Sequence, residues 1–264
     1  MTDEPAVRLP DVTEDNWYNS TLSLIQPAKG FRATTDALLL AASVPNNAQH
    51  PIELGAGLGA ALLPLATRLP GIPITAVELD PVMVTLLRQN IARNGMQDRI
   101  TTFHHDALDA SPPWQGQHDV ALINPPYNDA ASSQSDNFFR KTSMATQDLS
   151  AWVDAAERAL APKGRAVIIS RADRLDELMA ALAPSFGDIS LRAIHGNQDA
   201  PAKRILLTAR KNLASKVAIL PPLVMNGDDG ALSSEMARIS FERGAIDLIP
   251  EGRDVAKTRL PRQS

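Results

Sequence analysis

From about residue 50 onward, short apolar runs alternate with longer stretches rich in Ala and Leu. This alternation constrains the fold more than any other feature. The longer stretches carry apolar residues three and four positions apart, which is the spacing of one helix face. Strands that alternate with helices pair in parallel through right-handed crossovers. The pattern therefore predicts an α/β fold with a mainly parallel, doubly wound sheet and helices on both faces.

Seven runs are predicted to be strands: Pro51–Leu54, Ile74–Glu78, Ile100–His104, Asp119–Ile123, Ala166–Ser170, Ile189–Ile194 and Arg204–Ala209. The predicted helices are Thr35–Ser43, Ala60–Leu69, Pro81–Asn94, Ser150–Leu160, Arg174–Leu182 and Ser234–Arg243. Pro81 suits a first helical position, and Gly95 suits a left-handed cap. Only a short link separates the last two strands, so they are expected to form an antiparallel hairpin.

The chain has 264 residues and is 44% hydrophobic, enough for one large core. We expect a single domain over 1–264, with an irregular lead and a helix in 1–45, a core in 46–212 and an extension in 213–264. The last ten residues, which have little apolar surface, are expected to be disordered. The acidic start and the short apolar stretches predict a cytoplasmic protein without a membrane span. The absence of cysteine excludes disulfides and thiolate chemistry.

The first predicted strand leads into a glycine-rich turn, Glu53-Leu54-Gly55-Ala56-Gly57-Leu58-Gly59. Glycines there allow a sharp turn and bring the backbone close to a ligand, at the carboxyl edge where such sheets bind nucleotides. A tight turn without a ligand is the alternative. Glu78, at the end of the second predicted strand, favours a ligand, because a carboxylate there can accept hydrogen bonds from ribose hydroxyls.

Dinucleotides and S-adenosylmethionine both fit this arrangement. A dinucleotide fingerprint would place a third glycine at position 60, where the chain has Ala60. Gly55, Gly57 and Gly59 instead fall in a Glu-x-Gly-x-Gly-x-Gly pattern, and the acidic Glu53 suits a cationic ligand better than a pyrophosphate. The turn therefore favours S-adenosylmethionine as cofactor, with S-adenosylhomocysteine as the product.

The third predicted strand is followed by His105, Asp106 and Ala107. Asp106, beside Ala107, is placed where it could bind the adenine amino group of the cofactor, and an aspartate that caps a turn is the alternative. His104 and His105 are adjacent on a strand and point to opposite faces, with no ligand cluster nearby. We interpret both as structural and expect no metal.

The fourth predicted strand ends in Asn124-Pro125-Pro126-Tyr127. An amide, two rigid prolines and an aromatic ring form a shallow pocket for a planar group that bears an NH2. A stiff loop that ends the strand is the alternative. The cofactor pattern upstream makes amino-group chemistry the better interpretation.

The glycine turn, the acidic second strand, Asp106 and Asn-Pro-Pro-Tyr follow the order and spacing of class I S-adenosylmethionine-dependent methyltransferases. The tetrapeptide resembles motif IV of enzymes that methylate exocyclic or amide nitrogen. The segment Gln26–Leu40 resembles the one before the glycine turn in bacterial tRNA1(Val) adenine-37 N6-methyltransferases, and the likeness covers roughly residues 20 to 245. It implies a Rossmann-like, seven-stranded methyltransferase sheet.

The resemblance also implies roles for individual residues. The Asn124 side-chain oxygen, which adjoins the cofactor, and the Pro125 carbonyl accept hydrogen bonds from the NH2, while Tyr127 stacks on its plane. By the same analogy, three residues lie near the cofactor's methionine end or the mouth of the active site: Arg32, Thr35 and Asp36. A helix that simply begins near Thr34 or Thr35 explains these three about equally well.

The favoured function is adenine-N6 methylation of tRNA. A formal net charge of -4 does not indicate a strongly basic RNA-binding surface. One alternative is glutamine-N5 methylation of a protein such as a release factor, because an amide NH2 makes the same two hydrogen bonds. A non-catalytic S-adenosylmethionine-binding subunit is a second alternative.

Overall fold

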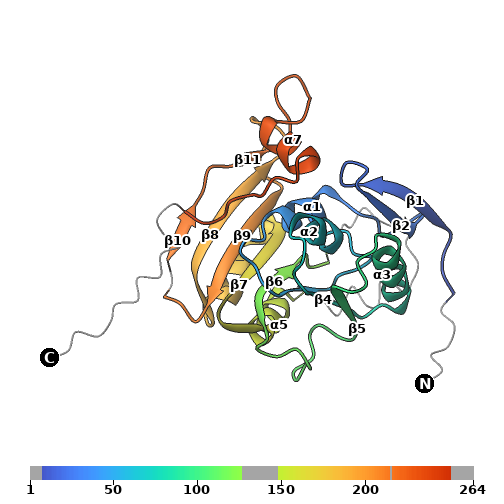
Figure 1. Ribbon diagram of the computed structural model, residues 1–264. Coiled ribbons are helices and arrows are strands. Elements are labelled where there is room, and N and C mark those ends of the chain that lie inside the picture. Colours follow the sequence, from blue (N-terminus) through green and yellow to red (C-terminus); the bar gives the residue numbers. More distant parts are fainter. Residues whose placement is uncertain (1–7, 127–147, 215, 251–264) are drawn as a thin grey trace.

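A computed structural model describes residues 8–126, 148–214 and 216–250. Its centre is a nine-stranded sheet with the strand order β10-β8-β9-β7-β6-β3-β4-β5, in which β11 also pairs with β8 (Figure 1). The strands are β3 (Pro51–Leu54), β4 (Ile74–Glu78), β5 (Ile100–His104), β6 (His118–Ile123), β7 (Leu160–Arg171), β8 (Phe186–His195), β9 (Arg204–Lys211), β10 (Val217–Ile219) and β11 (Leu223–Val224). Only β9 runs antiparallel to its neighbours, β7 and β8. The predicted parallel sheet and its C-terminal antiparallel hairpin are confirmed.

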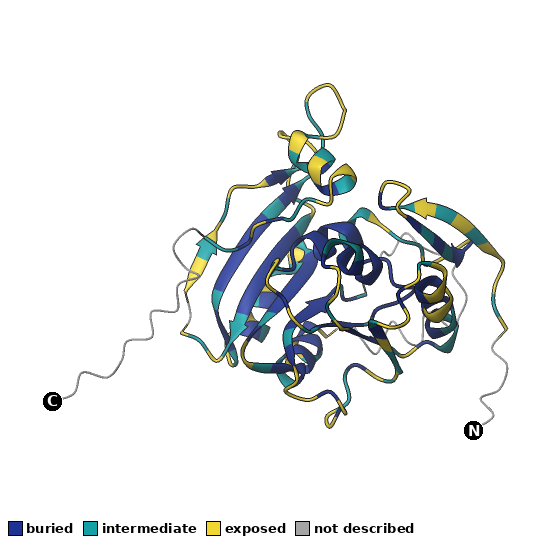
Figure 2. Cartoon of the chain, in the orientation of Figure 1, coloured by how far each residue is buried: buried dark blue, intermediate teal, exposed yellow. Residues whose placement is uncertain are grey.

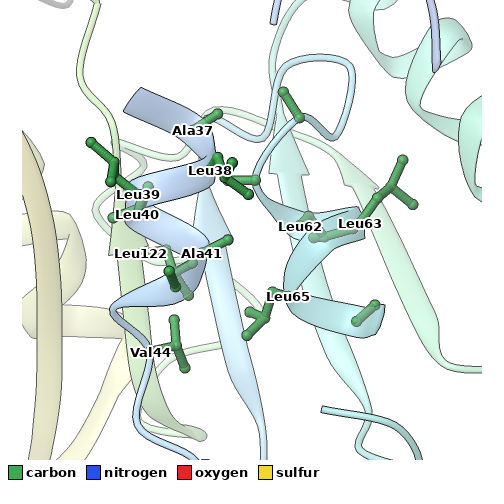
Figure 3. Packing of buried hydrophobic residues seen from close by; sticks show 14 of the residues in the cluster. Ala37, Leu38, Leu39, Leu40, Ala41, Val44, Leu62, Leu63, Leu65 and Leu122 are labelled. Carbon is green, nitrogen blue, oxygen red and sulfur yellow. The ribbon is translucent and has the colours of Figure 1, made fainter. Parts of the chain in front are cut away.

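Helices cover both faces of this sheet. One face packs against α1 (Thr35–Ala42), α2 (Leu62–Arg68), α3 (Pro81–Arg93) and α7 (Ser234–Phe241). The other face packs against α5 (Leu149–Ala159) and α6 (Leu175–Leu182), with η1 (Ala172–Arg174) before α6. Leu40 of α1 and Val44, just after that helix, lie beside Leu122 of β6, and leucines of α2 pack beside them (Figure 3). The central strands and α1 are therefore the most buried part of the molecule (Figure 2).

Helix α3 begins and ends as its sequence predicts. The Asp80 carboxylate accepts hydrogen bonds from the Val82 and Met83 amides at 2.7 and 3.2 Å, and Pro81 follows it. These bonds satisfy two of the amides that a helix leaves unpaired at its start. Gly95 ends the helix with a φ of 66°, which is the expected left-handed cap.

The described residues before α1 are not irregular as expected, although the helix expected in 1–45 is present as α1. Strands β1 (Val12–Trp17) and β2 (Leu22–Pro27) form an antiparallel hairpin that packs on α3. The Asn90 side chain accepts from the Ile25 amide at 2.7 Å and donates to the Ile25 carbonyl at 2.9 Å. Asn94, one helical turn later, pairs with the Ser23 backbone in the same way. Two side-chain amides thus take the place of a neighbouring strand along β2.

The sheet also has more strands than the seven predicted. Strands β10 and β11 extend it beyond β8, within the C-terminal extension. Helix α5 ends at Ala159, and β7 begins at Leu160 rather than at Ala166. Among the described residues, no helix is both long and apolar enough to cross a membrane. The expected disorder of the last ten residues concerns positions outside the described ranges.

Candidate functional site at the carboxyl edge of the sheet

The parallel register brings the predicted site residues to one edge of the sheet. Leu54 of β3 lies opposite Ile123 of β6 and Val77 of β4, so these strands end side by side. The amides of Gly55 and Ala56 both donate to the Val77 carbonyl at 2.9 Å. The glycine turn, Glu78 and the start of the Asn-Pro-Pro segment therefore meet at the carboxyl edge, where open α/β sheets bind their ligands.

The glycine turn is held tightly from both sides. Gly55 has a φ of 74°, and a Cβ there would lie 2.9 Å from the Trp152 ring of α5. A Cβ on Gly57 would lie 3.1 Å from the ring of Phe31, a side chain that is 53% exposed. At Gly55 both the positive φ and the Trp152 ring oppose a side chain, whereas at Gly57 the positive φ of 54° is the main reason for glycine.

Glu78 connects the end of β4 to this turn. Its Oε2 atom accepts from the Gly57 amide at 2.7 Å, and Oε1 accepts from the Leu79 and Asp80 amides at 2.9 and 2.8 Å. Burial raises the pKa of Glu78, although these amides act in the opposite direction. The three bonds fix the carboxylate in one orientation, and a carboxylate offers about four acceptor positions in all.

Glu53 is a buried carboxyl group directly before the turn. Burial, and then the neighbouring Glu78 carboxylate, raise the pKa of Glu53 to about 8, against a hydrogen bond from the Leu62 amide. Its Oε2 atom has no hydrogen-bond partner among the described residues. A cationic group placed here would stabilise the charged form of Glu53 and provide the missing partner.

Asn124 follows β6 directly, and its Oδ1 atom is buried without a hydrogen-bond partner in the described part of the chain. A buried acceptor without a partner is costly, so it marks a place where a donor belongs. Glu53 lies opposite Leu122, and Asn124 follows Leu122 by two positions. Strand periodicity therefore directs both side chains to the same face of the sheet.

Pro125 is buried and Pro126 is partly buried directly after Asn124. Tyr127, the fourth residue of the predicted motif, lies outside the described residues. The structure thus brings three members of the tetrapeptide to the carboxyl edge.

Asp106 is exposed and makes a local turn, in which its Oδ1 atom accepts from the Leu108 amide at 2.8 Å. Ala107 beside it is buried. The preceding His105 donates its backbone amide to the Glu78 carbonyl at 3.0 Å, and its ring lies 2.7 Å from Asp109 Oδ2. Asp106 and Ala107 therefore start from the same edge as Glu78.

Arg32 and Asp36 are engaged in ion pairs. Arg32 donates to Asp15 Oδ2 at 2.9 Å and to the Pro27 carbonyl at 2.7 Å. Asp36 accepts from Arg204 at 2.7 Å, a bond between α1 and the start of β9. Thr35 is the first residue of α1. Arg32 and Asp36 thus secure the segment that leads into α1 against the hairpin and the sheet.

Sequence reasoning missed three side chains that shape the site. Trp152 packs on Gly55, Phe31 lies over Gly57, and the buried Asn90 donates to the Leu58 carbonyl of the turn at 3.0 Å. Phe31 adjoins the predicted Arg32, but no spacing rule singles it out. Within the described ranges, no group of three or more metal-ligating side chains is found.

Comparisons with known proteins agree with this geometry. Residues 32–197, more than half of the chain, match the model of the methyltransferase small domain family. A tRNA1(Val) (adenine(37)-N6)-methyltransferase from Porphyromonas gingivalis is 31% identical over 165 residues, which are 58% of this chain and 64% of the relative. One from Shewanella sediminis is 31% identical over 163 residues, 59% and 66% of the two chains. The match thus spans slightly less than two thirds of these relatives.

Solved structures share the fold. A predicted O-methyltransferase from Agrobacterium tumefaciens superposes with a TM-score of 0.68 at 24% identity, covering 80% of this chain and 98% of that one. TYW2 of M. jannaschii, in complex with AdoMet, gives a TM-score of 0.55 at 13% identity over 78% and 89% of the two chains. The fold, the glycine turn and the family match lead to one conclusion: the chain belongs to the methyltransferase small domain family.

Proposed function

We propose that this chain is an S-adenosylmethionine-dependent N-methyltransferase that methylates N6 of an adenine in tRNA. The observation that carries the proposal is the Asn124 Oδ1 atom, a buried acceptor without a described partner at the carboxyl edge. An NH2 group is the donor that such an acceptor lacks. The names of the Porphyromonas and Shewanella relatives support adenine N6 of a tRNA as the target.

The residues at the carboxyl edge fit S-adenosylmethionine. Glu78, held by three backbone amides, keeps about one acceptor position for a ribose hydroxyl of the cofactor. Gly55, Gly57 and Gly59 let the backbone approach the ligand, and Asp106 with Ala107 would border the adenine. The Glu53 carboxyl, whose Oε2 atom has no hydrogen-bond partner among the described residues, suits the cationic methionine end. Thr35, at the start of α1, would face that end, and Arg32 and Asp36 would hold the entrance in place through their ion pairs.

The chain's own residues would then position the target amine. S-adenosylmethionine supplies the methyl group when bound and leaves as S-adenosylhomocysteine. Asn124 Oδ1 and the Pro125 carbonyl accept the two amine hydrogens, which favours a tetrahedral nitrogen whose lone pair points at the methyl carbon. Pro126 would keep the loop stiff, and Tyr127 is proposed to stack on the base. The amine nitrogen held by Asn124 and Pro125 would accept the methyl group that the cofactor supplies, the cofactor sulfur would be the leaving group, and the amine proton would pass to water.

Nucleoside mass spectrometry of RNA from a strain that lacks this gene tests the proposal. The expected result is the loss of N6-methyladenosine from one tRNA, restored by the wild-type gene and by the control Asn16→Ala, which changes an exposed asparagine on β1. An unchanged RNA profile would reject the tRNA substrate. A lost methylglutamine in the proteome would then identify an amide substrate instead.

A further inference from the structure

Phe31 is an aromatic side chain that lies exposed over the glycine turn. It is 53% exposed, although a Cβ on Gly57 would lie only 3.1 Å from its ring. The Gly57 amide in turn donates to Glu78 Oε2 at 2.7 Å. One side of the ring therefore rests on the turn, beside the carboxylate that is proposed to bind the cofactor ribose, while the other side is open to solvent.

The segment that carries Phe31 is fixed on both sides of it. The Ala28 amide donates to the Asp11 carbonyl at 2.8 Å, and the Ala33 amide donates to Gln26 Oε1 at 2.9 Å. These bonds attach the segment to the N-terminal hairpin and hold the ring over the turn. A side chain that is held in place before binding loses little further freedom when a ligand covers it.

A second exposed apolar side chain borders the same carboxylate. Leu79 is 40% exposed, and its amide donates to Glu78 Oε1 at 2.9 Å. Small-molecule sites combine apolar and aromatic walls with a few polar groups that fix the orientation of the ligand. Phe31 and Leu79 provide apolar surface of this kind, and Glu78 between them provides the polar group.

We propose that Phe31 contacts the cofactor: its open side packs against bound S-adenosylmethionine next to Gly57 and keeps water away from that side of the ligand. This inference rests on the proposed function, because it needs the cofactor at the carboxyl edge. The stabilisation comes from aromatic surface that leaves water when the cofactor binds.

The first test uses a single introduced thiol, since the chain has no cysteine of its own. Phe31→Cys would be labelled with a maleimide with and without saturating S-adenosylmethionine, and the cofactor should slow the labelling several-fold. Phe241→Cys is the matched control, because Phe241 is 54% exposed and its carbonyl accepts from Asn19 at the tip of the hairpin. The six-residue strands of the hairpin span about 20 Å, so labelling of Phe241→Cys should not change.

Two labelling results would overturn the inference. One is an unchanged labelling rate of Phe31→Cys in a protein that calorimetry shows to be saturated with cofactor. The other is labelling that tRNA slows and the cofactor does not, which would assign the ring to the RNA instead.

The second test measures the affinity for S-adenosylmethionine by calorimetry. Phe31→Ala should weaken binding about five- to tenfold, as expected when roughly 50 Å² of aromatic surface is no longer covered by the ligand. Phe31→Leu retains part of the apolar surface and should lose less affinity, and Phe241→Ala should bind as the wild type does. Wild-type affinity in Phe31→Ala would contradict the contact.

The failure of this inference can be distinguished from the failure of the proposed function. If the wild type does not bind S-adenosylmethionine, the proposed function is rejected together with the contact. If the wild type binds it and Asn124→Ala loses turnover, but the cofactor neither slows labelling at position 31 nor binds Phe31→Ala more weakly, the contact alone is rejected.

Discussion

Single residues decide how the glycine turn is held at the carboxyl edge. Glu78 was predicted to bind ribose, and the structure shows that its carboxylate also accepts three backbone amides, one of them from Gly57. The same side chain thus orders the turn and faces the proposed cofactor. The sequence placed Glu78 correctly because the alternation of strands and helices determines which edge it occupies.

Glu78→Ala should lower the affinity for S-adenosylmethionine at least about tenfold, since a charge-assisted bond to the ribose would be lost. Isothermal titration calorimetry measures the change. Asp98→Ala, which alters an exposed carboxylate after α3, should bind like the wild type. Unchanged affinity in a folded Glu78→Ala protein would remove Glu78 from the cofactor site.

A comparison of substitutions at Gly55 and Gly95 distinguishes the effect of backbone strain from the effect of side-chain packing. Both have positive φ, but a Cβ on Gly55 would meet Trp152 at 2.9 Å, whereas a Cβ on Gly95 would meet nothing within 4 Å. Gly55→Ala should therefore lower the free energy of unfolding by about 1–3 kcal/mol more than Gly95→Ala does. Urea unfolding of the two variants measures the difference. Equal losses would show that Trp152 does not restrict the turn.

At the level of elements, the N-terminal hairpin is the largest departure from the sequence prediction. Its first strand reads Val-Thr-Glu-Asp-Asn-Trp, a polar run in which no apolar alternation is visible. Its second strand is held by Asn90 and Asn94, which are far away in the sequence. Strand β7 was predicted too short because Pro162 and Gly164 near its start resemble loop residues. Contacts between side chains that are distant in the sequence produce no local sequence pattern, so they could not be predicted.

Asn90→Ala should detach the hairpin from α3. It would leave the Ile25 amide and the Ile25 and Leu58 carbonyls without their partner, at a cost of about 2–4 kcal/mol in the free energy of unfolding. Hydrogen exchange should become faster in residues 22–27. Asn94→Ala, at a less buried position, should cause a smaller change of the same kind. Equal exchange in wild type and Asn90→Ala would contradict the role of Asn90.

For the whole molecule, a buried histidine makes stability depend on pH. Burial lowers the pKa of His118 to about 4, although the His50 carbonyl lies 3.0 Å from its Nδ1 atom. Because the pKa of an unfolded histidine is about 6.5, the unfolded chain takes up the proton first as the pH falls. The contribution of neutral His118 to the free energy of unfolding is complete above about pH 6.5 and is lost as the pH falls from about 6.5 to 4.

Replacement of His118 by Gln should flatten this part of the pH profile. The wild type should lose about 3 kcal/mol of unfolding free energy through His118 over that range, and His118→Gln should not. Denaturant unfolding at several pH values provides the measurement. His104→Gln, at an exposed position, serves as the control and should retain the wild-type profile. Parallel profiles for wild type and His118→Gln would contradict the assignment.

The whole molecule also shows what the sequence could and could not predict about the site. The alternation of strands and helices predicts that Gly55, Glu78 and Asn124 lie at one edge of the sheet. The register of β3 with β4 and β6 confirms this placement. The contact between Asp36 and Arg204 could not be predicted, because it joins elements that meet only after the sheet has formed.

Methyl transfer by Asn124→Ala is the most direct test of the proposed chemistry. Transfer of a labelled methyl group from S-adenosylmethionine to tRNA from a strain lacking the gene would be measured beside cofactor affinity, with Asn16→Ala as the control. Asn124→Ala should reduce turnover by about a hundredfold or more, as for other lost transition-state hydrogen bonds, and should leave cofactor affinity largely intact. Turnover equal to that of the wild type would contradict the role of Asn124 in holding the target amine.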